Sequence, residues 1–459
     1  MLRALIAKEW LTSLLELRFL VCAALCVLLG IISVVVLRAD LEARRSDFGR
    51  NQSLYRDQAA EYGSYRDLQR RGVRVDRPPQ SFQVLFYGVE KTLDHTAVVS
   101  EDYLPGFQGD LNANPAMLLF PVADMLFVVA VVLSLLAFFI SYDTVAGERE
   151  SGTLKLVMSY PVPRDLLILA KWLGGYFSLA LPFLAALLIG ALLISMSAEV
   201  PFTATDWEAF AVTGAVSLLL LAVMFSIGLL VSVRARSSST AILGLVALWV
   251  LLALVVPNLG PYLAELAVPV PDVGAVEREI GLRTEAMAAE YRSQWRRGGR
   301  SFRNMTASQR TEFFRQRREQ RDQLQKDLNE ASAEIISDFE NRLRRQTDMA
   351  RVITRVSPVA CFVYANTDIG ATGVRHEERL IGALRQYQRQ FARYVAEQTE
   401  ATAGSGEEYD IDDLPDFRYR SDGMQERLDA RFVDVLLLAL FAVALFMAAF
   451  VSFLRSEVS

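Results

Sequence analysis

The stretch Ser141–Lys171 reads SYDTVAGERESGTLKLVMSYPVPRDLLILAK and lies between two long apolar runs. Each run is long enough to cross a bilayer, so this stretch connects two predicted membrane spans at one membrane face. Its basic residues are Arg149, Lys155, Arg164 and Lys171. Because lysine and arginine accumulate in cytoplasmic loops, they predict that this face is the cytoplasmic one. The orientation of the whole chain follows from that assignment.

The linker at residues 142–171 contains a short predicted helix. A charged turn, Glu148–Glu150, precedes Gly152 and Thr153, and an apolar run over 154–159 follows. Pro161 and a second proline two residues later end that run, because proline cannot continue a helix. Thr153 is predicted to cap the helix through its hydroxyl oxygen.

The predicted helix carries Leu154, Val157 and Met158 at helical spacing. With charges on both sides, it is expected to expose these three apolar side chains. A groove on a soluble partner binds such a helix through anchors spaced in this way. The sequence therefore predicts a protein-docking helix at the cytoplasmic face.

The run ERESGTLKLVMSYPVPRDLLILAKWLG at residues 148–174 resembles the segment after the second span in permeases of the ABC-2 transporter type. It is most similar to the branch that includes the nitrous-oxide-reductase maturation and gliding-motility permeases. The similarity rests on a Glu-x-Glu-x-Gly-Thr-Leu core, two prolines, a basic residue and a following span. It extends over about 124–175 and is looser elsewhere.

In that family the short helix is the coupling helix, which binds the ATP-hydrolysing subunit. The resemblance therefore implies an ATPase-coupling role for one set of residues in this chain: Asp143, Glu148, Arg149, Glu150, Gly152, Thr153, Leu154, Val157, Met158, Pro161 and Arg164.

Composition sets the class of protein. The chain is 52% hydrophobic and 22% charged, which is typical of a membrane protein with sizeable polar domains. A net charge of -5 gives no indication of a nucleic-acid partner. Three scattered cysteines and two distant histidines predict neither a disulfide framework nor a zinc site.

The predicted fold is an all-α polytopic membrane protein with six transmembrane helices and both termini in the cytoplasm. An amphipathic interfacial helix at 1–18 comes first; a helix that only leads into the first span is the equally weighted alternative. The expected spans are 19–37, 117–141, 172–196, 208–232, 239–258 and 432–454.

Two polar insertions are expected outside the cytoplasm, at 38–116 and 259–431. The first is predicted to continue the helix of the first span and to contain a strand over 81–89. The second is predicted to be helical over 276–295, 306–351 and 377–398, with a capping box opening the middle helix. The apolar stripes of these helices indicate internal packing or, as the alternative, a docking face for a substrate or an extracytoplasmic protein.

Asp124 lies in the first turn of the second span and is a membrane-interface candidate. An ionisable residue in a span is by default a functional candidate. The other reading is that a carboxylate here complements the helix dipole at the interface.

The sequence lacks a phosphate-binding loop, a zinc-protease motif and a hydrolase nucleophile elbow. The spans also look nearly free of buried charge near the membrane centre, which argues against ion-coupled transport. The sequence thus predicts a permease subunit that has no cofactor and no enzyme activity of its own. ATP and Mg²⁺ are expected on a cytoplasmic ABC ATPase.

The resemblance further implies a second permease copy or homologue, and membrane lipid is an expected contact in a bacterial inner membrane. Export, or mechanical work on an extracytoplasmic partner, is expected rather than import, and no nucleic acid is expected to bind. The alternatives are a non-transporting membrane scaffold whose outer hairpins organise partner proteins and, less favoured, an intramembrane enzyme.

Overall fold

A computed structural model describes residues 2–89, 95–100, 107–108, 124–197, 200, 202–298, 306–405 and 409–456. The chain divides into two compact units. Residues 1–257 and 355–459 form the first, and residues 258–354 form the second.

Six helices in the described residues are long and apolar enough to cross a membrane, which confirms the predicted class. These helices are Phe19–Ala60, Met125–Glu150, Arg164–Ser195, Ala204–Arg234, Ser238–Ala267 and Met424–Arg455. The first belongs to α2 (Leu17–Ala60), the third is α9, the fourth α10 and the sixth α17. Residues 117–123 of the predicted second span lie outside the described residues. Which side of a membrane the termini face stays a prediction.

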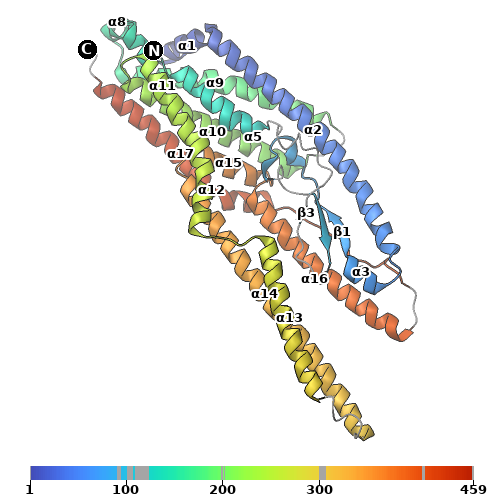
Figure 1. Ribbon diagram of the computed structural model, residues 1–459. Helices are drawn as coiled ribbons and strands as arrows, with labels where there is room; N and C mark the ends of the chain where they lie inside the picture. Colours follow the sequence, from blue (N-terminus) through green and yellow to red (C-terminus); the bar gives the residue numbers. More distant parts are fainter. Residues whose placement is uncertain are drawn as a thin grey trace. The chain divides into compact units, whose positions relative to one another are not determined.

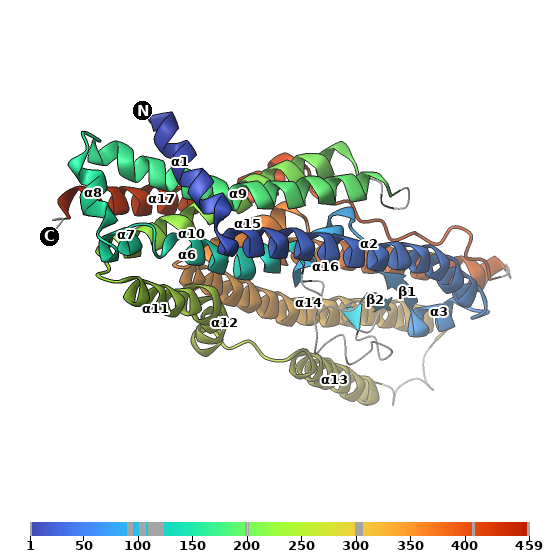
Figure 2. The same ribbon diagram turned by 90° about the horizontal axis from the view of Figure 1, so that it is seen from above.

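The N-terminal helix α1 (Leu2–Leu15) packs across α9. Gly174 of α9 permits this close approach, because a Cβ there would come within 2.8 Å of the Cβ of Glu9. Figures 1 and 2 show α1 at the same end of the first unit as α8 (Thr153–Ser159) and the end of α17. That end therefore gathers the N-terminal helix, the linker and the C-terminal turn.

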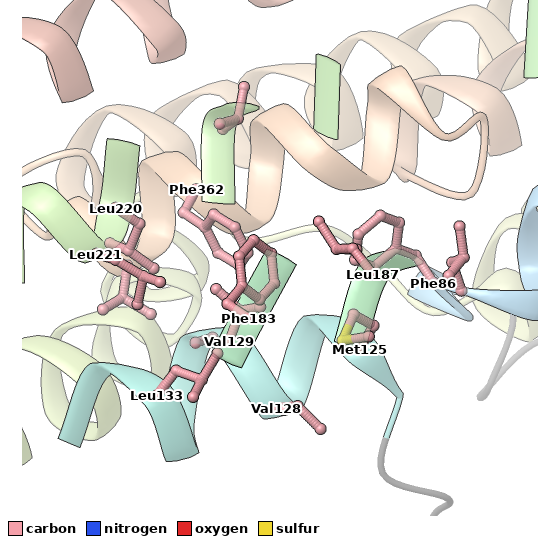
Figure 3. Packing of buried hydrophobic residues seen from close by; sticks show 14 of the residues in the cluster. Phe86, Met125, Val128, Val129, Leu133, Phe183, Leu187, Leu220, Leu221 and Phe362 are labelled. Carbon is pink, nitrogen blue, oxygen red and sulfur yellow. The ribbon is translucent and has the colours of Figure 1, made fainter. Parts of the chain in front are cut away.

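The span core is built around α10, whose apolar window is 78% buried, the largest share of the six spans. Figure 3 shows Phe183 of α9 beside Phe362, with Val129 and Leu133 of the second span nearby. Phe362 belongs to α15 (Pro358–Ile369), a short helix that packs against α10 and α17. This helix falls within the predicted outer insertion at 259–431, but its residues are mostly buried in the span core.

Two spans contain a turn of π-helix. In the second span η3 (Val128–Leu133) separates α5 (Met125–Phe127) from α6 (Ser134–Ser141). In the fifth span η4 (Val250–Val255) separates α11 (Ser238–Trp249) from α12 (Val256–Ala267).

The two π turns are tied into their surroundings by side chains. Trp249 Nε1 donates to Ser134 Oγ at 2.9 Å, which links the fifth span to the second. Ser357 Oγ donates to the carbonyl oxygen of Leu252 at 2.5 Å and also caps α15. Each π turn therefore lies next to a polar contact that fixes a neighbouring helix.

The two predicted insertions share one core, which we call the outer domain. It combines the end of α2, α3 (Tyr65–Arg71), a small sheet and α16 (Val374–Ser405). Tyr65 of α3 packs edge-on against Tyr394 of α16 and Tyr409, and its hydroxyl donates to the carbonyl of Asp410 at 2.6 Å. Residues more than 300 positions apart in the chain thus form a single hydrophobic cluster.

The sheet of the outer domain has the order β1-β2-β3, with β1 at Val73–Asp76, β2 at Thr96–Val99 and β3 at Phe107–Gln108. Both pairings are antiparallel, and Val73 pairs with Val99. The strand predicted over 81–89 was wrong, because Ser81–Val84 forms a 3-10 helix. Phe82 and Val84 are both buried in the span core, so the loose alternation came from packing around a helical turn.

Within the outer domain, a buried ion pair joins the sheet to the start of α16. Arg77 follows β1 and donates to both carboxylate oxygens of Glu377, at 2.5 and 3.0 Å. The Arg77 side chain is only 2% exposed. Such bidentate contacts fix geometry as well as charge, so they fix the position of the sheet relative to α16.

We expect the outer domain to lose stability as pH falls, because of His376. This imidazole is 6% exposed and lies near Arg77 and Arg427, and Tyr419 contacts its Nδ1 at 3.1 Å. Burial first, and then the two guanidinium groups, lower the pKa of His376 to about 3. The unfolded chain therefore binds a proton below about pH 6.5 that the folded chain does not.

Folding stability should then fall by up to ~1.4 kcal/mol per pH unit as pH drops below the unfolded pKa. Thermal unfolding of the wild type and of His376→Gln between pH 7.5 and 5.0 measures this dependence. The wild type should lose more stability than the variant over this pH range. Equal losses would show that His376 does not cause the pH dependence.

The second unit contains a helical hairpin, with α13 at Val273–Gly298 and α14 at Ala307–Thr354. The capping box predicted before α14 is confirmed. The Thr306 N–H donates to Gln309 Oε1 at 2.9 Å, and the Gln309 N–H donates to Thr306 Oγ1 at 3.5 Å. Val276, Ala331 and Ile335 are buried, which supports internal packing of these stripes.

Candidate functional site

The linker between the second and third spans folds into two short helices. α7 (Ala146–Glu150) is followed by a turn at Gly152, whose backbone is left-handed with φ +76°. α8 begins directly after this glycine. A residue with a Cβ is strained at this φ, so the sharp turn requires glycine. The predicted cap was wrong: Gly152 occupies the N-cap position, and the Thr153 hydroxyl instead donates to the carbonyl of Glu148 at 3.3 Å.

The start of α7 is fixed to α10. Ser232 Oγ accepts from the backbone N–H groups of Val145 and Ala146, at 3.0 and 3.1 Å, and all three residues are buried. These contacts satisfy amide groups that α7 leaves free at its first turn. The linker therefore begins from a fixed point on the central span.

The three charges of Glu148–Glu150 bind three different parts of the chain. Glu148 Oε1 accepts from Lys171 Nζ of α9 at 2.7 Å, and Lys171 also lies 3.5 Å from Glu9 of α1. Arg149 donates to the carbonyls of Val233 and Ala235, at 3.0 and 2.6 Å. Each of these contacts is internal to the chain.

The third charge, Glu150, accepts from the backbone N–H of Ser238 at 3.0 Å, which is at the start of α11. A carboxylate is favoured there because a helix N-terminus is electropositive. The resemblance implies that these charges take part in ATPase coupling. The structure shows them bracing the linker against α1, α9, α10 and α11.

Leu154 is not exposed, which corrects the prediction for α8. It is 1% exposed and packs with Leu167, Ile168, Leu229 and Phe453. Val157 and Met158 are half-buried against the same cluster. The stripe at positions 154, 157 and 158 is therefore the side of α8 that faces the chain's own core.

The exposed side of α8 carries other residues. Leu156 is 63% exposed, and Tyr160, just after the helix, is 64% exposed. Lys155 and Pro161 are also exposed. Leu154 and Leu156 are two positions apart and so project to roughly opposite sides of a helix. The sequence signal for Leu156 as the exposed apolar residue is that this seven-residue helix carries apolar residues on both sides.

The remaining predicted residues support the linker. Arg164 opens α9 and contacts the carbonyls of Leu454 and Ser456, both at 3.4 Å, at the end of α17. A cation there is favoured by the carbonyls left free at a helix C-terminus. Asp143 is half-buried, and its carbonyl accepts from the Gly147 N–H at 2.9 Å.

Asp124 caps the N-terminus of the second span, where a carboxylate complements the helix dipole. Its Oδ1 accepts from the Phe127 N–H at 2.9 Å, and its Oδ2 accepts from the Tyr87 N–H at 3.1 Å. The side chain is thus buried and held at both oxygens, one on the helix and one on the preceding loop. Capping and loop attachment account for its burial.

A buried charge network on α17 was missed. Asp434 is fully buried, and Arg355, just before α15, donates to it at 2.6 and 3.2 Å. Arg431, one turn earlier on α17, lies 3.6 Å from Asp434 and forms a close ion pair with Asp368 near the end of α15. The network lies near the N-terminal end of α17, before the apolar stretch of the sixth span.

The signal for this network was Arg431 and Asp434 at i, i+3 spacing, where a helix brings opposite charges together. The predicted sixth span begins at residue 432, and this boundary separates the two residues. The two ion pairs attach both ends of α15 to one turn of α17.

Comparison with known proteins gives one family and two curated relatives. The family described as ABC-2 family transporter protein matches residues 3–458. A probable ABC transporter permease protein NosY of Pseudomonas aeruginosa is 34% identical over 134 residues, 28% of this chain and 46% of that protein. Its counterpart in Stutzerimonas stutzeri is 33% identical over 78 residues, 17% of this chain and 28% of that protein. The chain thus matches less than half the length of each relative.

Proposed function

Because the chain belongs to the ABC-2 transporter family and is a multi-pass bacterial membrane protein, we propose that it is the permease subunit of an ATP-driven exporter. A separate cytoplasmic ATPase hydrolyses ATP, with Mg²⁺, and moves the spans through the linker. A second permease copy or homologue completes the membrane part. The observation that carries this proposal is the exposed pair Leu156 and Tyr160 on a linker that is otherwise fixed to the chain.

The geometry supports transmission of movement. A displacement applied at α8 reaches α10 through Ser232 and Arg149, and α9 through the Glu148–Lys171 ion pair. The same displacement reaches the fifth span through Glu150. These contacts make the linker and the inner ends of three spans move together, as rigid-body gating requires.

The first test is co-purification with the ATPase. A tagged chain purified from the membranes of its own organism should retain an ABC ATPase through two purification steps in detergent, and the complex should hydrolyse ATP. A non-transporting scaffold would purify without an ATPase. Absence of any bound ATPase would therefore favour the scaffold and contradict the proposal.

The second test concerns topology. We expect a cysteine introduced at Ser308, in α14, to react from outside the cell with a membrane-impermeant maleimide, and one at Ser239, in α11, to be protected. Both native serines are exposed, whereas Cys22, Cys26 and Cys361 are buried and should give little background. The reverse pattern would invert the proposed orientation.

A further inference from the structure

The outer domain contains a groove along one edge of its sheet. The groove has a volume of about 360 Å³ and is lined by all four residues of β1, by α2 and by residues 414–417. Among the described residues β1 pairs only with β2, so its other edge has no strand partner there. A strand edge beside a helix is the arrangement that accepts an added strand from another chain.

The main-chain groups at this edge follow from the register. The Arg77 N–H donates to the carbonyl of His95 at 2.7 Å, which continues the β1–β2 ladder by one pair. In an antiparallel ladder alternate residues bond to the neighbour, so Val73 and Val75 use their main-chain groups toward β2. The N–H and C=O groups of Arg74 and Asp76 therefore point to the open edge. No hydrogen bond within the described residues engages them.

The charges of the groove leave one cation available. Asp76 is held by Asn51, Tyr55 and Thr96, at 2.7, 3.2 and 2.7 Å. Arg56 is engaged by the carbonyl of Asp412 at 2.9 Å and lies 3.8 Å from Asp416. Arg74 is exposed, and within the described residues it forms no ion pair. The groove thus offers an open strand edge next to an uncompensated guanidinium.

We propose that this groove binds an extended, acidic peptide segment of a partner protein, which adds a strand to β1. The segment pairs with the main-chain groups of Arg74 and Asp76, and a carboxylate side chain lies beside the Arg74 guanidinium. A partner matching the four residues of β1 spans about 13 Å at ~3.3 Å per residue. This binding is separate from the ATPase interaction, because the groove lies in the outer domain and the linker at the opposite end of the span bundle (Figure 1).

Two substitutions test the two parts of the proposal, which are occupation of the groove and strand pairing with β1. Gly49 lines the groove from α2, and a Cβ built on it meets nothing within 4 Å, so Gly49→Trp introduces a large side chain at the groove without a clash at its Cβ. Arg74→Pro removes the N–H that points to the open edge, and proline is tolerated at such edge positions. Gly382→Trp is the matched control, because Gly382 also faces open space on α16 but does not line the groove.

The probe is a display library of random octapeptides, selected on the purified full-length chain in nanodiscs. Enriched peptides are then synthesised with a fluorophore, and their dissociation constants are measured by anisotropy. We expect acidic, β-prone sequences whose dissociation constant rises at least tenfold with Gly49→Trp and with Arg74→Pro. Gly49→Ala and Gly382→Trp should change it less than twofold, and Arg74→Ala should weaken acidic peptides more than neutral ones.

Three results would overturn the proposal. If the enriched peptides bind Gly49→Trp as tightly as the wild type, their binding site lies outside the groove. Unchanged binding after methylation of alternate peptide amides would exclude strand pairing. If no octapeptide is enriched and Gly49→Trp instead dissociates a dimer of the chain, the groove is an interface between copies.

Discussion

Leu156→Asp should abolish stable binding of the ATPase while leaving the permease folded and abundant in the membrane. Leu156 is 63% exposed, so an aspartate there is hydrated in the isolated chain. In a complex, the aspartate would be buried in an apolar groove without a partner; even as a neutral polar group it would cost roughly 2–7 kcal/mol, and the ionised carboxylate would cost more. The measurements are the amount of co-purified ATPase and the ATP turnover of the complex, with at least a tenfold loss expected in both.

Two controls separate this effect from damage to the fold. Leu282→Asp makes the same change at a leucine that is 71% exposed on α13 and should leave ATPase binding intact. Leu154→Ala should behave in the opposite way, with a loss of about 2–5 kcal/mol in stability because that side chain is buried in the chain's own core. Retention of the ATPase by Leu156→Asp would show that α8 does not transmit movement.

Glu148→Gln should be milder. It weakens the contact with Lys171 that braces the linker but leaves the exposed face unchanged. The expected result is normal assembly with reduced coupling of ATP hydrolysis to span movement.

Arg431→Met should destabilise the span core more than any surface charge substitution. Arg431 is 5% exposed and neutralises Asp368, which is 4% exposed. Removing one partner of a buried ion pair leaves the other charge uncompensated and costs about 3–5 kcal/mol. The apparent free energy of unfolding in detergent, from denaturant titration, measures this loss.

The double variant Arg431→Met with Asp368→Asn should recover most of the stability, because Asp434 keeps its contact with Arg355. Arg342→Met is the surface control: its ion pair with Asp338 in α14 is about half exposed, so it should cost less than about 1 kcal/mol. A double variant as unstable as the single would mean that packing, not charge, sets the cost.

Sequence reasoning succeeded where the signal is local. Six long apolar segments can only be satisfied as helices in a bilayer, so the spans could be predicted from hydropathy and length alone. The capping box at Thr306 is likewise a relation between residues three apart. The glycine turn and the two prolines also placed the short helix of the linker close to where the structure has α8.

Predictions from the sequence failed where a distant segment of the chain determines which residues are buried. The periodicity of Leu154, Val157 and Met158 indicates an apolar stripe, but only the position of Phe453, some 300 residues later, shows that the stripe is internal. The shared core of the outer domain depends in the same way on Tyr65 meeting Tyr394. α15 was missed because twelve residues are too few to be read as a span.

The π turns in the second and fifth spans bear on how the length of these spans can change. A π turn holds one residue more than the α-helical turn it replaces, so removing one residue from Val128–Leu133 restores a regular α-helix. The same deletion between Ser134 and Ser141 rotates every later residue of the span by about 100°. It would turn Ser141 away from Gly228, against which it packs closely. Homologues that differ by one residue in this span should therefore carry the insertion or deletion within the π turn, which absorbs it without changing the face that meets α10.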